Sequence, residues 1–441
     1  MNEHKISRRG VLGLAGAGIA ATALAGCAGT GGSSDDSASA GGGQTSDGTI
    51  QFWSNHPGGS KELETKLIGE WNKQNPEHKV NLVDGGANYE ELGQKFNAAL
   101  AGGALPDVLV ASDVTWFNFA LNKATTPLDD IWKEAGVKPD TYVDTLREDY
   151  AFGGKHYGMP YSRSTCLMYF DTDALKEAGL PTDRGPETWQ EFDEWAPKLV
   201  KAKGGKPALI VPDGSDYLDW YFQGMMWTFG GAYSREWEAT FTDEKSIEAV
   251  KFLADQVAKG HIAIAKDASN TFGIGGAAGL LQSTGSLGGL TTAAKVPFIT
   301  TFLPGPNPGC ATGGAGLAVP NGISDERKLW AVKFIDFLTS TKNTIEFTQK
   351  TGYMPVRKDA LDDPTEKAYL AKNPNAETAI KQLHENTKSQ DYARVFVSGG
   401  GARIGGALDR ICVGKQDAAK VFGELQTETQ KIIDRDIKPK L

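Results

Sequence analysis

The sequence lacks most of the patterns that mark an enzyme or a metalloprotein. Its six histidines are scattered, and no two have the i, i+4 spacing of a zinc-binding helix. It has no CxxC pair, no GxSxG nucleophile elbow and no GxxxxGK[ST] phosphate loop. We therefore predict a protein without catalytic residues, metal or cofactor. Carboxylates are plentiful, so the sequence alone leaves a catalytic acid pair open.

One long stretch, residues 268–324, contains no acidic residue, and Lys295 is its only lysine or arginine. The stretch is rich in glycine, above all at 273–276 and 312–316. Backbone N–H groups in such a segment can bind an anion without repulsion from carboxylates. The alternative is that these glycines lie in buried strands and tight turns. Residues 273–278 also match a loose dinucleotide fingerprint, but the acidic residue expected about 20 positions later is missing.

Long hydrophobic runs are missing as well, and the most apolar segment lies at the N-terminus. Residues 11–24 are apolar but too few to span a bilayer stably, which takes roughly 20 residues. The run follows the basic residues Lys5, Arg8 and Arg9 and ends in small residues, an order typical of a secretory signal. Ser7-Arg8-Arg9-Gly10-Val11-Leu12 resembles a twin-arginine export signal.

The end of this signal, Leu24-Ala25-Gly26-Cys27, resembles a bacterial lipobox, in which the cysteine is acylated. We therefore predict that residues 1–27 are a twin-arginine-type lipoprotein signal peptide. Cys27 would then be lipidated and would anchor the protein to the outer face of the cell membrane. The alternative is an ordinary cleaved signal with a chance cysteine. Residues 28–48 are almost all small or polar, which predicts a flexible linker.

Positive charge and cysteine are both scarce. The formal net charge is −9, which argues against nucleic acid or an anionic membrane face as the main partner. After the signal only Cys166, Cys310 and Cys412 remain, enough for one internal disulfide at most. The sequence does not indicate whether any of them pair.

The remaining chain is long enough for two domains or lobes. Apolar periodicity predicts alternating strands and helices, which is typical of a parallel α/β sheet. The predicted order is strand 50–53, helix 61–75, strand 80–83, helix 89–101 and strand 107–110, with later helices at 187–203, 246–259 and 325–339.

Several separated motifs resemble the solute-binding proteins of ABC importers. They are Leu167-Met168-Tyr169-Phe170 with the following residues 171–180, Pro186-Glu187-Thr188-Trp189, and Gly352-Tyr353-Met354-Pro355-Val356. Within that group the chain is similar, from about residue 49 to 410, to the binding components of glycerol-3-phosphate/glycerophosphodiester importers. The motifs that carry this similarity are Phe52-Trp53-Ser54, Asn88-Tyr89-Glu90, and residues 161–165, 283–287, 313–315 and 349–355. Residues 142–161 and 341–363 especially resemble actinobacterial-type members, some of which prefer glycerophosphocholine.

The resemblance implies a two-lobed periplasmic-binding-protein-like α/β fold of type II, each lobe a mostly parallel sheet flanked by helices and joined by hinge crossovers. We expect lobe 1 to comprise residues 49–160 and 297–322, and lobe 2 to comprise 161–296 and 323–441. It also implies a monomer that captures a small phosphorylated glycerol and delivers it to an ABC permease and ATPase complex.

Site residues follow from the resemblance position by position. The residues that match family ligand contacts are Tyr89, Asp113, Ser164, Ser283, Gly314 and Tyr353. Arg394 is the candidate for the phosphate-pairing arginine, with Arg403 as second candidate. Asp113 would bind glycerol hydroxyls, and Tyr89 would face a choline cation. Some members have a tryptophan near 213–218, and its absence here favours a diester bulkier than glycerol 3-phosphate.

Three other functions stay open at this point. A sugar-binding protein of the same fold would pair stacked aromatics with several carboxylates, against which the acid-free stretch weighs. A secreted hydrolase of glycerophosphodiesters would need a nucleophile or metal ligands. An adhesion or signalling lipoprotein would have no deep cleft.

Overall fold

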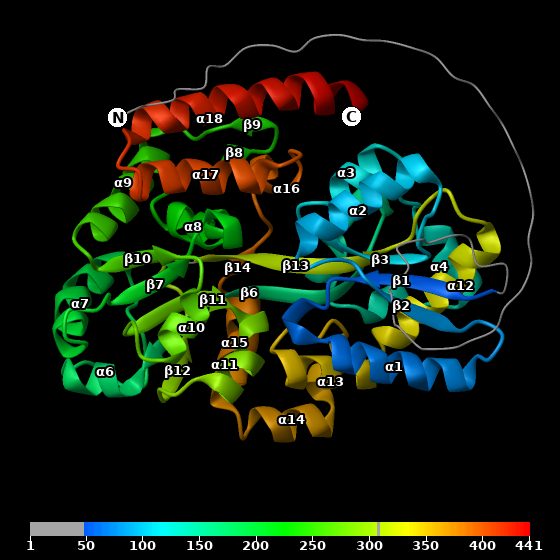
Figure 1. The fold of residues 1–441 in the computed structure, drawn as a ribbon, viewed down its shortest axis with the longest axis horizontal. Coiled ribbons are helices and arrows are strands. Elements are labelled where there is room, and N and C mark those ends of the chain that lie inside the picture. The colour runs from blue at the N-terminus through cyan, green and yellow to red at the C-terminus, as the bar shows by residue number, and fades with distance from the viewer. Residues whose placement is uncertain (1–47, 307–308) are drawn as a thin grey trace, which may run out of the picture. The chain divides into compact units, whose positions relative to one another are not determined.

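The computed structural model describes residues 48–306 and 309–441. The predicted signal peptide, its lipidation site Cys27 and nearly all of the predicted linker lie outside the described residues. The described chain forms an α/β structure in which one sheet runs through the middle and helices cover both of its faces (Figure 1). No helix among the described residues is both long and apolar enough to cross a membrane.

The sheet has ten strands among the described residues. Its strand order is β10 (Ile262–Ala265), β7 (Leu209–Pro212), β11 (Gly279–Ser283), β6 (Met159–Asp171), β13 (Cys310–Ala318), β3 (Val108–Ser112), β1 (Ile50–Ser54) and β2 (Val80–Asp84), with β12 (Phe298–Thr301) on β6 and β14 (Thr387–Lys388) on β13. Both ends of the sheet are parallel, whereas β6 and β13 are antiparallel to each other in the middle. Two parallel α/β units are thus joined into one mixed sheet.

The helices surround this sheet. They are α1 (Lys61–Gln74), α2 (Tyr89–Gly102), α3 (Trp116–Leu121), α4 (Asp129–Ala135), α5 (Asp144–Glu148), α6 (Thr172–Glu177), α7 (Trp189–Ala202), α8 (Leu218–Thr228), α9 (Glu244–Ala258), α10 (Ala268–Gly273), α11 (Leu287–Ala293), α12 (Asp325–Leu338), α13 (Thr341–Thr351), α14 (Pro364–Leu370), α15 (Pro374–Glu385), α16 (Tyr392–Val395), α17 (Gly400–Cys412) and α18 (Ala418–Ile432). Two small hairpins, β4 (Ala151–Phe152) with β5 (Lys155–His156) and β8 (Ser234–Arg235) with β9 (Glu238–Ala239), complete the regular structure.

The first α/β unit, from β1 to β3, confirms the predicted strand–helix alternation. Each predicted element agrees with an observed one to within one or two residues. Local capping explains the precision: the Asn88 side chain accepts a hydrogen bond from the Glu91 N–H at the start of α2. Gly103 ends this helix with φ +80°, a conformation that glycine adopts without strain.

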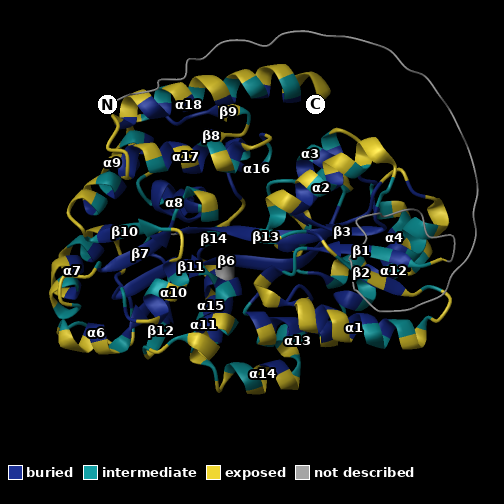
Figure 2. Ribbon diagram, in the orientation of Figure 1, coloured by how far each residue is buried: buried dark blue, intermediate teal, exposed yellow. Residues whose placement is uncertain are grey.

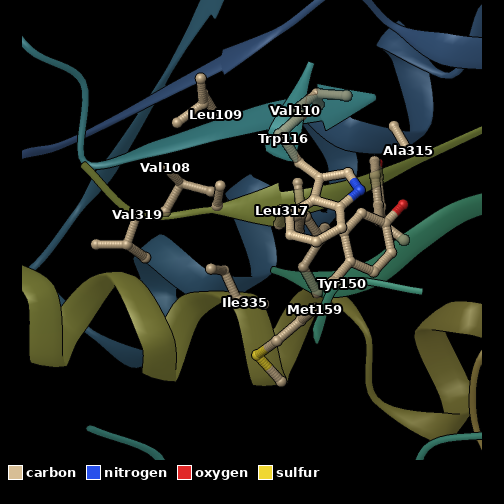
Figure 3. Close-up of a cluster of buried hydrophobic side chains, with 14 of the residues drawn as sticks. Val108, Leu109, Val110, Trp116, Tyr150, Met159, Ala315, Leu317, Val319 and Ile335 are labelled. Atoms are coloured by element: carbon tan, nitrogen blue, oxygen red, sulfur yellow. The ribbon is translucent and has the colours of Figure 1, made fainter. Parts of the chain in front are cut away.

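Two large hydrophobic clusters flank the middle of the sheet. The first contains β1–β3, α1, α2 and the inner face of α12, and Figure 3 shows part of it, with Trp116, Tyr150 and Met159 close to Leu317 and Ile335. The second contains α7, α8, α9, α17 and α18 around β7. The strands are almost entirely buried, whereas the helices expose their outer faces (Figure 2).

This packing divides the chain differently from the expected lobes. Helix α12 was expected in lobe 2, but its buried residues lie in the first cluster. The chain returns to the first cluster after β13 and joins the second from Ala393 through α17 and α18, before Ile433 and Ile437 pack in the first again.

Strands β6 and β13 run through both clusters. At one end of β6, Met159 and Tyr161 belong to the first cluster, and at the other end Met168 and Phe170 belong to the second. Between these ends, residues 162–165 of β6 lie opposite residues 312–315 of β13. We call this segment of the two strands the crossing.

The glycines of the crossing are required by close packing. A Cβ atom on Gly313 would lie 2.5 Å from the indole ring of Trp220. Gly314 has φ +95°, and its Cβ would overlap the carbonyl oxygen of Ser162. Close packing therefore explains why glycine is required at these two positions of the acid-free stretch. Cys166, Cys310 and Cys412 are buried free thiols.

Candidate functional site

Two cavities open at the buried pair of Arg394 and Asp113, and the crossing lines the smaller one. The larger, of about 390 Å³, lies between α2, the loop after β3, residues 214–219 and the start of α17. The smaller, of about 180 Å³, is lined by the loop after β3, residues 148–151, Arg163 and residues 389–396. Arg394 lines the larger cavity and Asp113 the smaller, and these two side chains contact each other. The elements that wall the cavities come from both hydrophobic clusters.

Arg394 is the centre of a buried charge cluster. It is 2% exposed; its Nε donates to Asp219 Oδ2 at 2.6 Å, and its Nη1 donates to Asp113 Oδ2 at 3.2 Å. The Gln390 side chain bridges Arg394 and Asp113, accepting from the first and donating to the second. Burial alone would lower the pKa of the Arg394 guanidinium, but the two carboxylates outweigh burial and raise it. The arginine is therefore fixed in place and charged.

One donor of Arg394 stays available. Among the described residues Nη2 makes no hydrogen bond, and it lies 3.9 Å from where a Cβ of Gly401 would be. Gly401 lies in the first turn of α17, on the wall of the larger cavity. A ligand in that cavity would find a positioned N–H donor on a buried cation, which is a strong type of hydrogen bond.

Two tyrosines meet at Ser162 of the crossing, outside the lining of the two cavities. The Tyr89 hydroxyl lies 3.4 Å from the Tyr353 hydroxyl and 3.4 Å from Ser162 Oγ. Burial raises the pKa of both tyrosines, so both hydroxyls are neutral and can donate. The Tyr353 ring lies against Gly285, where a Cβ would be only 2.6 Å from the ring. Ser283, two residues before this glycine, accepts a hydrogen bond from the Gly285 N–H.

The crossing itself contributes Ser164 and Gly314. Ser164 is buried on β6 opposite Gly313, and the Gly314 carbonyl accepts a hydrogen bond from the Asp113 N–H at 2.9 Å. Between the two serines of β6 lies Arg163, whose Nη2 donates to Asp149 at 2.5 Å and whose Nη1 donates to the Tyr150 hydroxyl. Arg163 is thus paired one-to-one with a carboxylate.

A tyrosine occupies the segment in which related proteins were expected to carry a tryptophan. The Tyr217 hydroxyl donates to Glu90 Oε2 at 2.9 Å and closes one side of the larger cavity. Beside it, burial raises the pKa of Asp216 to about 6, with further contributions from the charges of Asp213 and Glu90.

The structure brings most of the predicted site residues together. Asp113, Ser164, Gly314 and Arg394 lie at or next to the crossing, while Tyr89 and Tyr353 contact each other beside Ser162. Arg403 lies behind the cavity wall: on α17 it donates to the carbonyl of Ser398, which lines the larger cavity, and its Nε lies 3.9 Å from Glu428 on α18. Arg403 itself does not line either cavity. Of the two arginines, the geometry therefore favours Arg394.

Sequence reasoning missed Asp219, Gln390 and Arg163. Asp219 had a usable signal, because it is an acid within the apolar run Leu218-Asp219-Trp220-Tyr221-Phe222, and a buried carboxylate requires a partner. Arg163 lies inside the motif 161–165, yet nothing in the sequence relates it to Asp149. Gln390 carries no signal of its own.

Comparison with known proteins shows which proteins this chain is similar to. The UgpB protein of Mycobacterium tuberculosis, solved in complex with glycerophosphocholine, is 47% identical, with a TM-score of 0.85 over 88% of this chain and 99% of that one. The sn-glycerol-3-phosphate-binding periplasmic protein UgpB of Escherichia coli K12 is 29% identical over 76% of this chain and 80% of its own. Maltose-bound MalE3 of T. maritima shares the fold at 20% identity, with a TM-score of 0.73 over 87% and 99% of the two chains.

These structures confirm the predicted type II periplasmic-binding-protein-like α/β fold. Residues 66–378 match the family described as bacterial extracellular solute-binding protein. Since this match covers most of the chain, the protein belongs to the bacterial extracellular solute-binding protein family.

Proposed function

We propose that this protein captures glycerophosphodiesters such as glycerophosphocholine, and/or sn-glycerol 3-phosphate, for uptake by an ABC importer. The observation that carries the proposal is the buried Arg394, which pairs with Asp113 and keeps one donor uncommitted at the larger cavity. The neutral hydroxyls of Tyr89 and Tyr353, which meet at Ser162 of the crossing, add further donors. The glycerophosphocholine complex of the relative at 47% identity supports the same ligand class.

Each group has a role in this proposal. Arg394 Nη2 and the tyrosine hydroxyls donate to phosphate oxygens, and Ser164, Ser283 and the Gly314 N–H add neutral donors. Asp113 cannot serve a phosphate, because both are negative, so it accepts from glycerol hydroxyls. The face of Tyr89 is available to a choline cation.

The proposed attachment to the membrane rests on the N-terminal sequence. Members of this family work outside the cytoplasm with permease and ATPase components. Lipidation of Cys27 would hold a monomer on the outer face of the membrane, and the short linker would keep the loaded protein near its permease. Labelling with a radioactive fatty acid, lost in Cys27→Ser, tests the anchor.

Isothermal titration of the mature protein with glycerophosphocholine tests the ligand. Binding should be saturable, and Arg394→Ala should weaken it at least a hundredfold, because the charged hydrogen bond and the position of Asp113 are both lost. Arg403→Ala is the matched control and should bind like the wild type. Circular dichroism verifies that both variants are folded.

Three results would contradict the proposal. They are no binding to any phosphorylated glycerol, tight binding to a neutral oligosaccharide instead, and release of free choline during incubation, which would indicate a hydrolase. Wild-type affinity in Arg394→Ala would remove that arginine from the site.

A further inference from the structure

The charges around the larger cavity do not balance. Arg394 is its one cation among the described residues, while Glu90 and Asp219 line the same cavity. Asp113 contacts Arg394 from the other side. The arginine is therefore outnumbered by carboxylates at the place where an anionic ligand is proposed to bind.

Asp219 differs from the other two carboxylates. It is 2% exposed, it is hydrogen-bonded to Arg394 Nε at 2.6 Å, and it lies in the first turn of α8, where a negative charge is favourable. Its charge is screened little by water, so it acts on anything that approaches Arg394. Glu90, by contrast, is exposed, and Asp113 is 14% exposed.

The neighbouring arginine provides a contrast within the same molecule. Arg163 has one carboxylate within ion-pairing distance, Asp149, and its other hydrogen-bond partner is a neutral tyrosine hydroxyl, while Asp113 acts on it from further away. That pair has no net charge. Arg394 with Asp113 and Asp219 has an excess of one negative charge in a buried setting. A site of this kind offers hydrogen-bond donors to a phosphate but disfavours each additional negative charge on it.

The geometry points to Asp219 as a specificity-determining residue, which makes the site select singly charged phosphodiesters over dianionic phosphomonoesters. This inference rests on the proposed function and narrows it. A phosphodiester has one negative charge, and with a cationic headgroup the ligand has none overall. A phosphomonoester has close to two near neutral pH, since its second pKa is about 6. Asp219 acts through the charge of the site, without contacting the glycerol.

Shape alone predicts a different pattern, and a small ligand separates the two explanations. The methyl diester of sn-glycerol 3-phosphate is nearly the size of the monoester but has only one negative charge. If the cavity selected by size, this methyl diester and glycerol 3-phosphate would bind alike. If charge decides, the methyl diester should group with glycerophosphocholine.

Titration calorimetry at pH 7.5 with these three ligands tests the inference. The wild type should bind the methyl diester on the order of tenfold more tightly than glycerol 3-phosphate, as expected for one more buried like charge. Asp219→Asn keeps the shape and an acceptor for Arg394, and should reduce this ratio about fivefold or more. Asp107→Asn is the matched control, because Asp107 is also buried and also accepts from an arginine Nε at 2.6 Å, but outside both cavities. It should leave the ratio unchanged.

The wild-type protein gives a second test that does not depend on how a variant folds. At pH 5.5 glycerol 3-phosphate is mostly singly charged, so its affinity should approach that of the methyl diester. Burial raises the pKa of Asp219 and of Asp216, so these carboxylates also lose charge toward pH 5.5, and this loss moves the ratio of the two affinities in the same direction as protonation of the ligand. A ratio that stays constant between pH 7.5 and pH 5.5 would contradict the inference.

Equal binding of the methyl diester and glycerol 3-phosphate by the wild type would overturn the inference and leave the proposed function intact. If Asp219→Asn lost affinity for all three ligands by the same factor, Asp219 would only hold Arg394 in position, and its proposed role in selectivity would be contradicted. A folded wild-type protein that binds none of the three would contradict the proposed function, and the inference with it.

Discussion

The first hydrophobic cluster and the crossing share strands β6 and β13, but these strands bury apolar side chains in the first and polar side chains in the second. Along β6 and β13, Met159 and Leu317 pack among apolar neighbours and need nothing further (Figure 3). A few residues on, the same strands bury Ser164 and Arg163, which cost free energy unless they are hydrogen-bonded. Buried apolar side chains therefore stabilise the fold at one end of β6. In the middle of the same strand, buried polar side chains are held in place for the proposed binding site.

The largest effect on stability should come from the apolar cluster. Phe52 is fully buried, with its ring 5.6 Å from that of Phe334. Phe52→Ala should lower the free energy of unfolding by about 3–5 kcal/mol, because it leaves a cavity in a packed core. Urea denaturation measures this loss. Below the unfolding transition, affinity for glycerophosphocholine should stay within about twofold of the wild type. A large loss of affinity in a variant that is still folded would contradict the distinction between the cluster and the crossing.

A glycine of the crossing should affect both stability and binding. Gly314→Ala forces a side chain into φ +95° and against the Ser162 carbonyl. We expect a loss of about 2 kcal/mol or more in unfolding free energy. Ligand affinity should fall as well, since Asp113 is held by the Gly314 carbonyl. Normal affinity in this variant would show that the crossing does not shape the site.

Replacing Asp216, which lies next to the wall of the larger cavity, should raise the free energy of unfolding rather than lower it. The pKa of Asp216 is raised to about 6 in the folded state, so between about pH 4 and 6 the folded protein binds more protons than the unfolded chain. The contribution of this group to stability is therefore greatest at low pH and is lost as the pH rises through 6. Asp216→Asn should raise the free energy of unfolding at pH 7.5 by about 1 kcal/mol, a value that already allows for solvent screening. At pH 4 it should change the free energy of unfolding little. Thermal melts at the two pH values measure the difference, and an equal effect at both would contradict the assignment.

The smallest effect on stability, with a clear effect on binding, should come from a single hydroxyl. Tyr353→Phe keeps the ring against Gly285 and removes only the donor next to Tyr89. Affinity for glycerophosphocholine should fall about tenfold, while the melting temperature stays nearly unchanged. Calorimetry combined with thermal melts tests both halves of this expectation.

The sequence predicted the regular parts of the fold because local patterns determine them. Helices α1, α2 and α12 follow from apolar periodicity, and the Ser324 side chain caps α12 by accepting a hydrogen bond from the Arg327 N–H. The return of α12 to the first cluster was not predictable in this way. It depends on how β13 crosses between the units, which is a tertiary property.

The candidate site also contains residues that the sequence predicted and residues that it did not. Tyr89, Asp113 and Arg394 were predicted from a position-by-position resemblance to a family, and the structure pairs Arg394 with Asp113 and Tyr89 with Tyr353. Asp219 and Gln390 were missed, because their importance lies in contacts with Arg394 over long separations in sequence. A family resemblance can suggest individual candidate residues, whereas contacts between residues far apart in sequence become visible only in the fold.

The most direct test of the central claim is a crystal structure of the mature protein with glycerophosphocholine. The account predicts ligand density at the crossing, with phosphate oxygens within hydrogen-bonding distance of Arg394 Nη2 and the Tyr353 hydroxyl. A ligand bound elsewhere, or a phosphate that contacts neither Arg394 nor Tyr353, would contradict it.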